Sequence, residues 1–189
     1  MHIPTENVLI DDTDSKLARL RGLIRTVPDF PKPGIVFIDI MPLLGDPAGL
    51  ALAVELVSEP FRNMKIDKVV GAESRGFIFG TATARDLSAG FVPIRKPGRL
   101  PCDTISESYD LEYGSNQLEI HKDAIKPGET VLVIDDLLAT GGTIAACCRL
   151  VETLGGQVAG IAFLVELTFL NGRQQITQYP VHSVLKFDE

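Results

Sequence analysis

The chain has 189 residues, a length typical of one domain, and 45% of them are hydrophobic, which is enough for a sizeable core. Its formal net charge of -7 at pH 7 argues against nucleic acid or anionic membranes as partners, so a phosphate ligand needs a local site. Cys102, Cys147 and Cys148 form neither a disulfide framework nor a zinc pattern, and no apolar run approaches the ~20 residues of a membrane span. We therefore expect a soluble, cytoplasmic protein with reduced thiols.

Helices and strands alternate along most of the chain. A helix capped by Asp14 is expected to end before the proline-rich residues 28–34, and a second helix begins at Asp46 and Pro47. Helical patterns follow at residues 77–87 and 143–154. Short runs rich in Val and Ile predict strands at 68–72, 91–94, 130–136, 157–167 and 181–185. This alternation predicts an α/β fold, a parallel sheet covered by helices on both faces.

Two stretches interrupt the alternation. Residues 1–13 form a polar N-terminal extension without a structural prediction, and residues 95–125 form a polar insertion with two weakly alternating pieces. Such an insertion after a parallel strand is either a disordered loop or a lid with a small hairpin. The whole chain, 1–189, is predicted to be a single domain.

The most informative segment is VLVIDDLLATGGT, residues 131–143. An apolar strand ends in Asp135 and Asp136, and a short loop rich in glycine and threonine leads into a helix. Ligands of open parallel sheets bind beyond the carboxyl ends of the strands, and N–H groups at a helix N-terminus hold phosphate. We therefore predict that the two acids accept hydrogen bonds from sugar hydroxyls beside a phosphate. The predicted phosphate-binding residues are Ala139, Thr140, Gly141, Gly142 and Thr143.

Two other phosphate motifs are absent. No lysine follows Gly142, as a nucleotide P-loop requires, and the GxGxxG dinucleotide pattern does not occur. Elsewhere, Ser74 and Arg75 follow the strand at 68–72, where a tight turn can present N–H groups. Because its neighbours are apolar, Arg75 needs an anionic partner.

The segment 131–143 resembles the phosphoribosyl diphosphate (PRPP) motif of the type I phosphoribosyltransferase family. The segments 73–80, 95–101, 108–114 and 164–173, together with PDFPKPGIVFIDIMPLL near the start, resemble the members of that family that act on adenine. The resemblance extends over roughly residues 15 to 185. It implies the fold of that family, with a small hood and a flexible lid loop, and an enzyme of purine salvage that forms AMP and pyrophosphate from adenine and PRPP.

The resemblance also implies a chemistry for the site. Loss of pyrophosphate leaves an oxocarbenium-like ribose, so cations are needed at the leaving group and anions around the sugar. Mg²⁺ prefers oxygen ligands and is expected to arrive on the diphosphate and ribose hydroxyls, without a protein cage. In the family, cations at the positions of Arg95, Lys96 and Arg99 approach the pyrophosphate, sometimes from a neighbouring subunit, so a homodimer is expected.

Further roles follow from the same resemblance. Arg75 is expected to take part in catalysis, and Glu112 occupies the position of the general base that removes the proton lost by the purine. Tyr113 beside it is expected to help close the lid. Adenine is expected to be held through backbone atoms of Val36 and Ile38, with Phe37 over the ring. An arginine is usual at position 38, so Ile38 is a departure that concerns base affinity.

Two alternatives remain open. An oxopurine phosphoribosyltransferase would carry a lysine and an acidic base inside the PRPP motif, where this chain has Leu137 and Leu138. A regulator that senses PRPP or purines without catalysis would need a DNA-binding region and a basic surface, and this chain is acidic.

Overall fold

The protein is described by a computed structural model that covers residues 12–110 and 115–188. The chain divides into two compact units, residues 1–53 and 54–189. The division falls within one helix, α3 (Pro47–Ser58). Each unit is described by itself.

The first unit contains a small antiparallel hairpin beside short helices. Its elements are α1 (Asp12–Gly22), β1 (Arg25–Val27), β2 (Phe37–Asp39) and α2 (Met41–Gly45), followed by the start of α3. Arg25 pairs with Asp39 in register, and its Nη2 lies 2.5 Å from Asp39 Oδ2. The side chain of Ile38 is buried, while Val36 is 49% exposed and the rings of Phe30 and Phe37 meet edge to face at 5.2 Å. The hydrophobic patterns of the sequence did not predict β1, β2 or α2.

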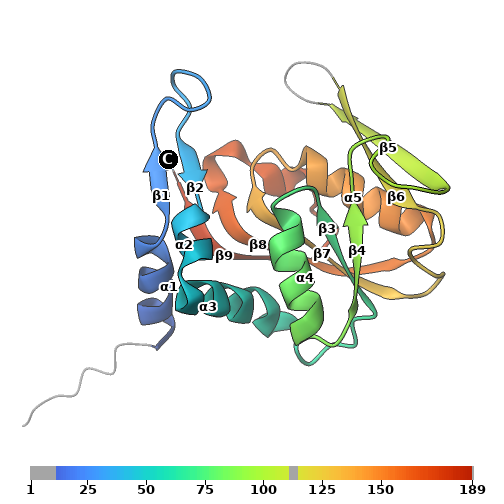
Figure 1. The fold of residues 1–189 in the computed structure, drawn as a ribbon, viewed down its shortest axis with the longest axis horizontal. Coiled ribbons are helices and arrows are strands. Elements are labelled where there is room, and N and C mark those ends of the chain that lie inside the picture. Colours follow the sequence, from blue (N-terminus) through green and yellow to red (C-terminus); the bar gives the residue numbers. More distant parts are fainter. Residues whose placement is uncertain (1–11, 111–114, 189) are drawn as a thin grey trace, which may run out of the picture. The chain divides into compact units, whose positions relative to one another are not determined.

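The second unit is built on a parallel sheet of five strands, as the alternation predicts (Figure 1). The strands lie in the order β4-β3-β7-β8-β9, and each neighbouring pair is parallel. Their bounds are β3 (Lys68–Ala72), β4 (Gly90–Ile94), β7 (Thr130–Leu138), β8 (Gln157–Leu167) and β9 (Val181–Phe187). The helices that follow the end of α3 are α4 (Gly76–Asp86) and α5 (Gly142–Thr153), and the described part of the unit also has short 3₁₀ turns at Glu59–Phe61, Thr168–Leu170 and Gly172–Gln175.

The strand order locates a switch point between β3 and β7. The connection through α4 leads from β3 to β4 on one side, whereas the connection through α5 leads from β7 to β8 on the other. Since such crossovers are right-handed, α4 and α5 cover opposite faces of the sheet (Figure 1). Ligands of open α/β sheets bind at the carboxyl ends of the strands beside such a point.

A second hairpin lies in the predicted insertion. Its strands β5 (Thr104–Asp110) and β6 (Ser115–His121) pair along their whole length, so the hairpin alternative holds for this part of residues 95–125. The hairpin packs against α5, and Arg149 Nε lies 2.5 Å from Glu107 Oε1. Leu118 and Ile120 of β6 are buried in the same core as the sheet.

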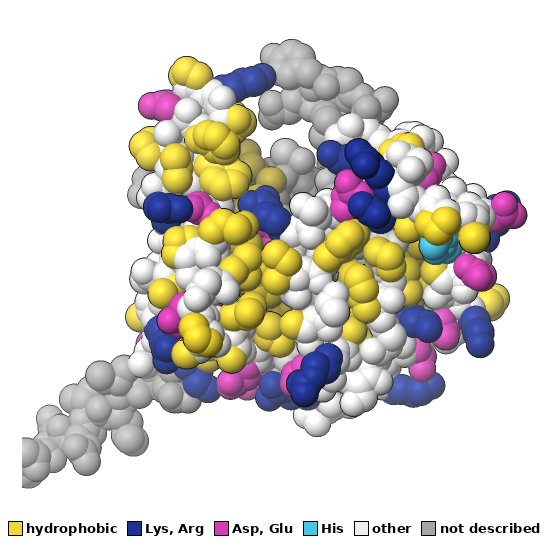
Figure 2. Space-filling model, viewed as in Figure 1, with side chains coloured by type: hydrophobic (Ala, Val, Ile, Leu, Met, Phe, Trp, Pro, Cys, Tyr) yellow, Lys and Arg dark blue, Asp and Glu magenta, His cyan; other side chains and the backbone are white. Residues whose placement is uncertain are grey.

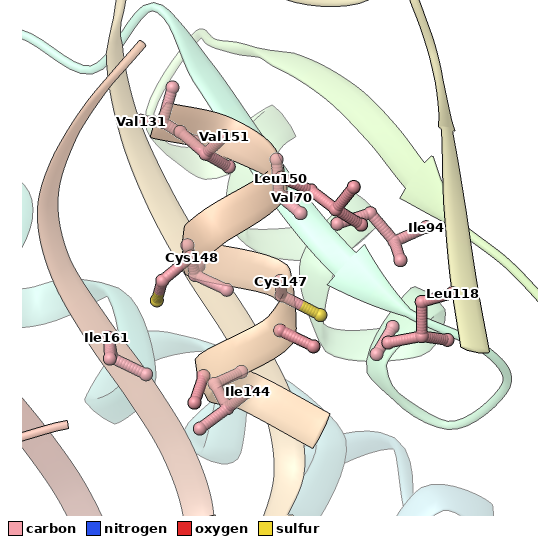
Figure 3. Close-up of a cluster of buried hydrophobic side chains, with 14 of the residues drawn as sticks. Val70, Ile94, Leu118, Val131, Ile144, Cys147, Cys148, Leu150, Val151 and Ile161 are labelled. Atoms are coloured by element: carbon pink, nitrogen blue, oxygen red, sulfur yellow. The ribbon is translucent and has the colours of Figure 1, made fainter. Parts of the chain in front are cut away.

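Helix α5 is the centre of that core. Apolar side chains on its buried face, among them Ile144, Cys147 and Leu150, point toward side chains of the sheet and the hairpin (Figure 3). Cys147 and Cys148 are fully buried, and burial raises the pKa of both thiols, to about 12 for Cys148. Both therefore act as small apolar groups and not as nucleophiles.

Candidate active site

A cavity of about 340 Å³ lies at the carboxyl ends of β3 and β7, at the switch point. It is lined by the turn after β3, the end of β7 with the following loop, Lys96, and Tyr109 and Asn116 of the hairpin. Every one of these parts belongs to the second unit. The predicted residues Ser74, Arg75, Lys96, Asp135, Asp136, Ala139, Thr140, Gly141 and Thr143 are all among the lining residues.

The acidic pair ends the apolar run of β7. Asp136 is only 4% exposed, and its backbone N–H donates to Asp135 Oδ1 at 2.9 Å. A methyl group in place of the Gly76 hydrogen would lie 2.8 Å from the same Oδ1, so glycine at the start of α4 leaves room for this carboxylate. The packing of α4 onto the sheet thus determines where the acid lies.

Arg75 faces this pair. Its Nε lies 3.0 Å from Asp136 Oδ2, so the anionic partner that its surroundings require is, in this structure, the second aspartate. Burial raises the pKa of Asp135 well above its usual range, and the charge of Asp136 adds to the rise. Burial also raises the pKa of Asp136, and the nearby guanidinium of Arg75 opposes that rise. A buried and a half-buried carboxylate with one cation favour a ligand that brings further positive charge or hydrogen-bond donors.

The raised pKa of Asp135 predicts a pH-dependent cost in stability. The folded state holds the Asp135 proton more tightly than the unfolded chain does. Protonated Asp135 therefore contributes fully to stability below about pH 4, and this contribution is lost as the pH rises through the raised pKa. We expect Asp135→Asn to raise the melting temperature of the ligand-free protein, and by more at pH 8 than at pH 4.5. Thermal unfolding at the two pH values measures the effect.

Asp67 provides the control with the opposite sign. The N–H of Thr130, with Lys65, lowers the pKa of Asp67, so its contribution is lost as the pH falls. Asp67→Asn should therefore lower the melting temperature by a similar amount at pH 8 and at pH 4.5, because both values lie above the usual pKa of an aspartate. An Asp135→Asn variant that melts below the wild type at pH 8 would contradict the assigned burial cost.

The loop between β7 and α5 has the geometry of a phosphate site. Gly141 precedes α5 with φ 87°, a left-handed conformation that favours glycine, and it turns the chain into the helix. The first N–H groups of a helix have no partner within it, and they lie at the positive end of the helix dipole. At α5 these groups begin at Gly142 and Thr143, of which Thr143 lines the cavity.

The predicted cations have different surroundings. Arg95 Nε lies 3.0 Å from Glu73 Oε2, and the N–H of Lys96 donates to the same oxygen at 3.1 Å. Burial would raise the pKa of Glu73, but the Lys96 N–H and the Arg95 guanidinium together lower it. The side chain of Arg95 is therefore engaged with Glu73, while Lys96 lines the cavity and Arg99 is exposed. Figure 2 shows Lys and Arg side chains gathered around acidic ones near the end of β4.

Other predicted residues do not join this site in the described structure. Val36, Phe37 and Ile38 belong to the first unit, whereas the residues that line the cavity belong to the second. Glu112 and Tyr113 lie outside the described residues. The sequence analysis did not single out Tyr109 and Asn116, which face each other across the hairpin and line the cavity. Their alternation in the predicted strand pieces was the only available signal.

Comparison with known proteins shows which domain and which proteins this chain resembles. Residues 43–183 match the model of the phosphoribosyl transferase domain. The chain is 55% identical over 170 residues to a protein of Koribacter versatilis named adenine phosphoribosyltransferase, covering 90% of this chain and 93% of that one. A curated protein of the same name from Chloroflexus aurantiacus is 56% identical over 168 residues, which cover 89% of this chain and 97% of that one.

Solved structures agree with this result. The crystal structure of adenine phosphoribosyltransferase from Rhodothermus marinus has a TM-score of 0.88 and 56% identity, over 92% of this chain and 99% of that chain. The Saccharomyces cerevisiae enzyme, complexed with adenine and an imino-altritol bisphosphate, has a TM-score of 0.86 and 40% identity, over 91% and 99% of the two chains.

Proposed function

Since the chain belongs to the adenine phosphoribosyltransferase family of glycosyltransferases, we propose that it forms AMP and pyrophosphate from adenine and PRPP in the cavity between β3 and β7. The observation that supports this site most strongly is the order of groups after β7. An acidic pair in which Asp136 is buried, a left-handed glycine and a helix N-terminus follow one another along the cavity wall.

The loop at residues 139–143 binds the 5′-phosphate of PRPP in this proposal. N–H groups of the loop and of the first turn of α5 donate to the phosphate oxygens, and the hydroxyls of Thr140 and Thr143 add donors. Asp135 and Asp136 then accept hydrogen bonds from the ribose hydroxyls. Those hydroxyls supply the donors that a buried carboxylate pair requires.

The leaving pyrophosphate is assigned to the turn after β3. Ser74 and Arg75 line the cavity there, and Lys96 approaches it from the end of β4. As the bond to pyrophosphate breaks, negative charge grows on the leaving group and positive charge on the ribose ring. The guanidinium of Arg75 stabilises the first, and the acidic pair stabilises the second. Arg95 acts on the leaving pyrophosphate indirectly, through its ion pair with Glu73, which also accepts a hydrogen bond from the backbone N–H of Lys96. Arg99 is an exposed cation in the same segment.

Mg²⁺ fits the same donor set. It prefers oxygen ligands and keeps several waters, and Asp135 and Asp136 bring carboxylate oxygens to the cavity. The Oδ2 of Asp136 accepts no well-aligned hydrogen bond from the described residues. We propose that Mg²⁺ enters on the diphosphate and ribose oxygens of PRPP, where it neutralises charge on the leaving group, with the acidic pair holding those hydroxyls.

Adenine recognition is assigned to the first unit. Backbone atoms of Val36 and Ile38 are proposed to hold the base, with Phe37 over the ring. The buried side chain of Ile38 leaves its backbone as the part available for this contact.

The homodimer and the cytoplasmic location are proposed from the family alone. Over residues 12–110 and 115–188, no helix has the length and apolar character needed to cross a membrane.

Glu112 is proposed as the general base that accepts the purine proton. We expect Glu112→Gln to lower kcat by about 10²- to 10⁴-fold while leaving the KM for PRPP within about twofold, because the amide cannot accept a proton. Steady-state kinetics with both substrates varied measures the two effects. Glu107, which pairs with Arg149 at the stem of the hairpin, offers the control: Glu107→Gln should keep kcat. Equal losses in both variants would remove this role from Glu112.

The activity is tested by following nucleotide and pyrophosphate with Mg²⁺, PRPP and, in parallel, adenine, hypoxanthine or guanine. We expect AMP from adenine alone. This result would show that the site tolerates isoleucine at position 38, Ile38, where an arginine is usual. Turnover of only the oxopurines would overturn the base assignment and keep the PRPP chemistry. Binding of PRPP without turnover of any base would favour a regulator.

A further inference from the structure

One ion pair, between the buried Glu166 and the half-exposed Arg173, lies outside the roles assigned so far. Arg173 sits in the 3₁₀ turn that follows β8, in the segment LVELTFLNGR. Its Nε donates to Glu166 Oε1 at 2.6 Å and its Nη2 to Glu166 Oε2 at 2.7 Å, a two-pronged contact. The same guanidinium donates to the carbonyl of Val181 at 3.2 Å and to Ser183 Oγ at 3.3 Å. Arg173 thus ties the turn to both β8 and β9.

Glu166 is placed next to the end of β7. It is 4% exposed, and it lies in register with Leu138 on one side and Lys186 on the other. Leu138 immediately precedes the loop at residues 139–143. The ion pair is therefore anchored on the neighbouring strand, at the level where the phosphate loop begins.

The residue before Arg173 is in contact with that loop. A Cβ on Gly172 would overlap the carbonyl oxygen of Ala139, and a Cβ on Gly141 would overlap the carbonyl oxygen of Gly172. The two backbones thus pack against each other without room for a side chain on either glycine. Position and conformation of residues 139–141 depend on where Gly172 is held.

We propose that Arg173 and Glu166 are positioning residues for the phosphate loop, and that they hold the backbone of Gly172 as the wall against which Ala139–Gly141 take the shape that binds a 5′-phosphate. The inference rests on the proposed function of that loop. N–H groups stabilise an anion effectively only when they are fixed in place before it binds. The ion pair should therefore increase the affinity for ligands that carry a 5′-phosphate and leave the affinity for adenine unchanged.

The test uses the double variant Arg173→Met with Glu166→Gln. Changing both partners avoids leaving a buried carboxylate without its cation, which would by itself destabilise the fold. We expect the dissociation constant of AMP, measured by calorimetry, and the KM of PRPP to rise about 10- to 100-fold. The KM of adenine should stay within about twofold. The melting temperature and circular dichroism report whether the variant is folded.

An arginine–aspartate pair elsewhere in the same unit supplies the control. Arg62 Nε and Nη2 lie 3.3 and 3.2 Å from Asp86 Oδ2, and neither residue lines the cavity. The double variant Arg62→Met with Asp86→Asn should lower the melting temperature without changing the affinity for AMP. A second variant, Gly172→Ala, keeps the ion pair but displaces the loop. It should therefore weaken the binding of AMP as the Arg173→Met/Glu166→Gln variant does.

Other outcomes overturn the inference. An unchanged affinity for AMP in a folded Arg173→Met/Glu166→Gln variant would do so, whatever the effect of Gly172→Ala. A lower kcat with unchanged KM for PRPP would also do so, because it indicates only a smaller folded fraction. Where the double variant does not fold, Arg173→Lys takes its place, because lysine keeps a cation beside Glu166 but cannot make the two-pronged contact, and an unchanged affinity for AMP in that variant would overturn the inference. A wild-type protein that neither binds AMP nor turns over adenine would refute the proposed function instead, and the wild-type measurement separates the two failures.

Discussion

Asp135→Asn combined with Asp136→Asn is expected to lower kcat/KM for PRPP by at least about 10²- to 10³-fold, the usual effect of losing one electrostatic group at a site of developing charge. The two acids act together on the ribose, so the effect of the pair is not the product of the single effects. Asparagine has nearly the same volume, and the backbone N–H of Asp136 retains an oxygen at position 135 to donate to. The fold should therefore persist, and circular dichroism and thermal unfolding check that it does.

A matched control comes from the helix that follows the loop. Glu152 lies at the far end of α5, where it accepts a hydrogen bond from Tyr179 Oη at 2.7 Å. Glu152→Gln removes one negative charge without touching the cavity, and its kcat/KM should stay within about twofold. If the double aspartate variant kept its steady-state activity, the assignment of these acids to PRPP would be removed.

Arg75→Gln is expected to lower kcat by about 10²- to 10³-fold, because the guanidinium stabilises the leaving pyrophosphate more in the transition state than in bound PRPP. In the reverse reaction, the KM of pyrophosphate should rise as well. The variant also leaves Asp136 Oδ2 without its cation at 3.0 Å, so some loss of stability accompanies the kinetic effect. Kinetics in both directions separates these contributions.

Coupling between Arg75 and Asp136 provides an internal check. In the background of Asp136→Asn, the further change Arg75→Gln should have a smaller effect than in the wild type, because contacting residues are not additive. Arg85, an exposed arginine in the last turn of α4, is the control, and Arg85→Gln should leave kcat unchanged. Equal losses from Arg75→Gln and Arg85→Gln would contradict a specific role for Arg75.

The sheet could be predicted because its strands are continuous apolar runs. β3 and β8 have the predicted bounds, and α4 and α5 begin one residue before their predicted starts. β7 extends two residues beyond its prediction, through Leu137 and Leu138, because these residues still pair with β8. The acids lie within β7 and the glycines follow it closely in the sequence, so their place in the site was also predictable.

Long-range contacts were not predictable from the same patterns. β1 has three residues, and its partner β2 lies beyond the proline-rich segment, so no periodicity identifies the pair. The ion pairs of Arg75 with Asp136 and of Arg173 with Glu166 each join two separate elements near the carboxyl ends of the strands. A glycine such as Gly172 shows its role only when the backbone opposite it is known. These contacts depend on the folded sheet and not on local sequence.

A crystal structure of the protein with bound AMP tests the central claim most directly. We expect the 5′-phosphate at the N–H groups of residues 140–143, the ribose hydroxyls within hydrogen-bond distance of Asp135 and Asp136, and Arg75 beside the anomeric carbon. Density for AMP in which the phosphate lies away from this loop, or in which the ribose does not meet the two aspartates, would contradict it.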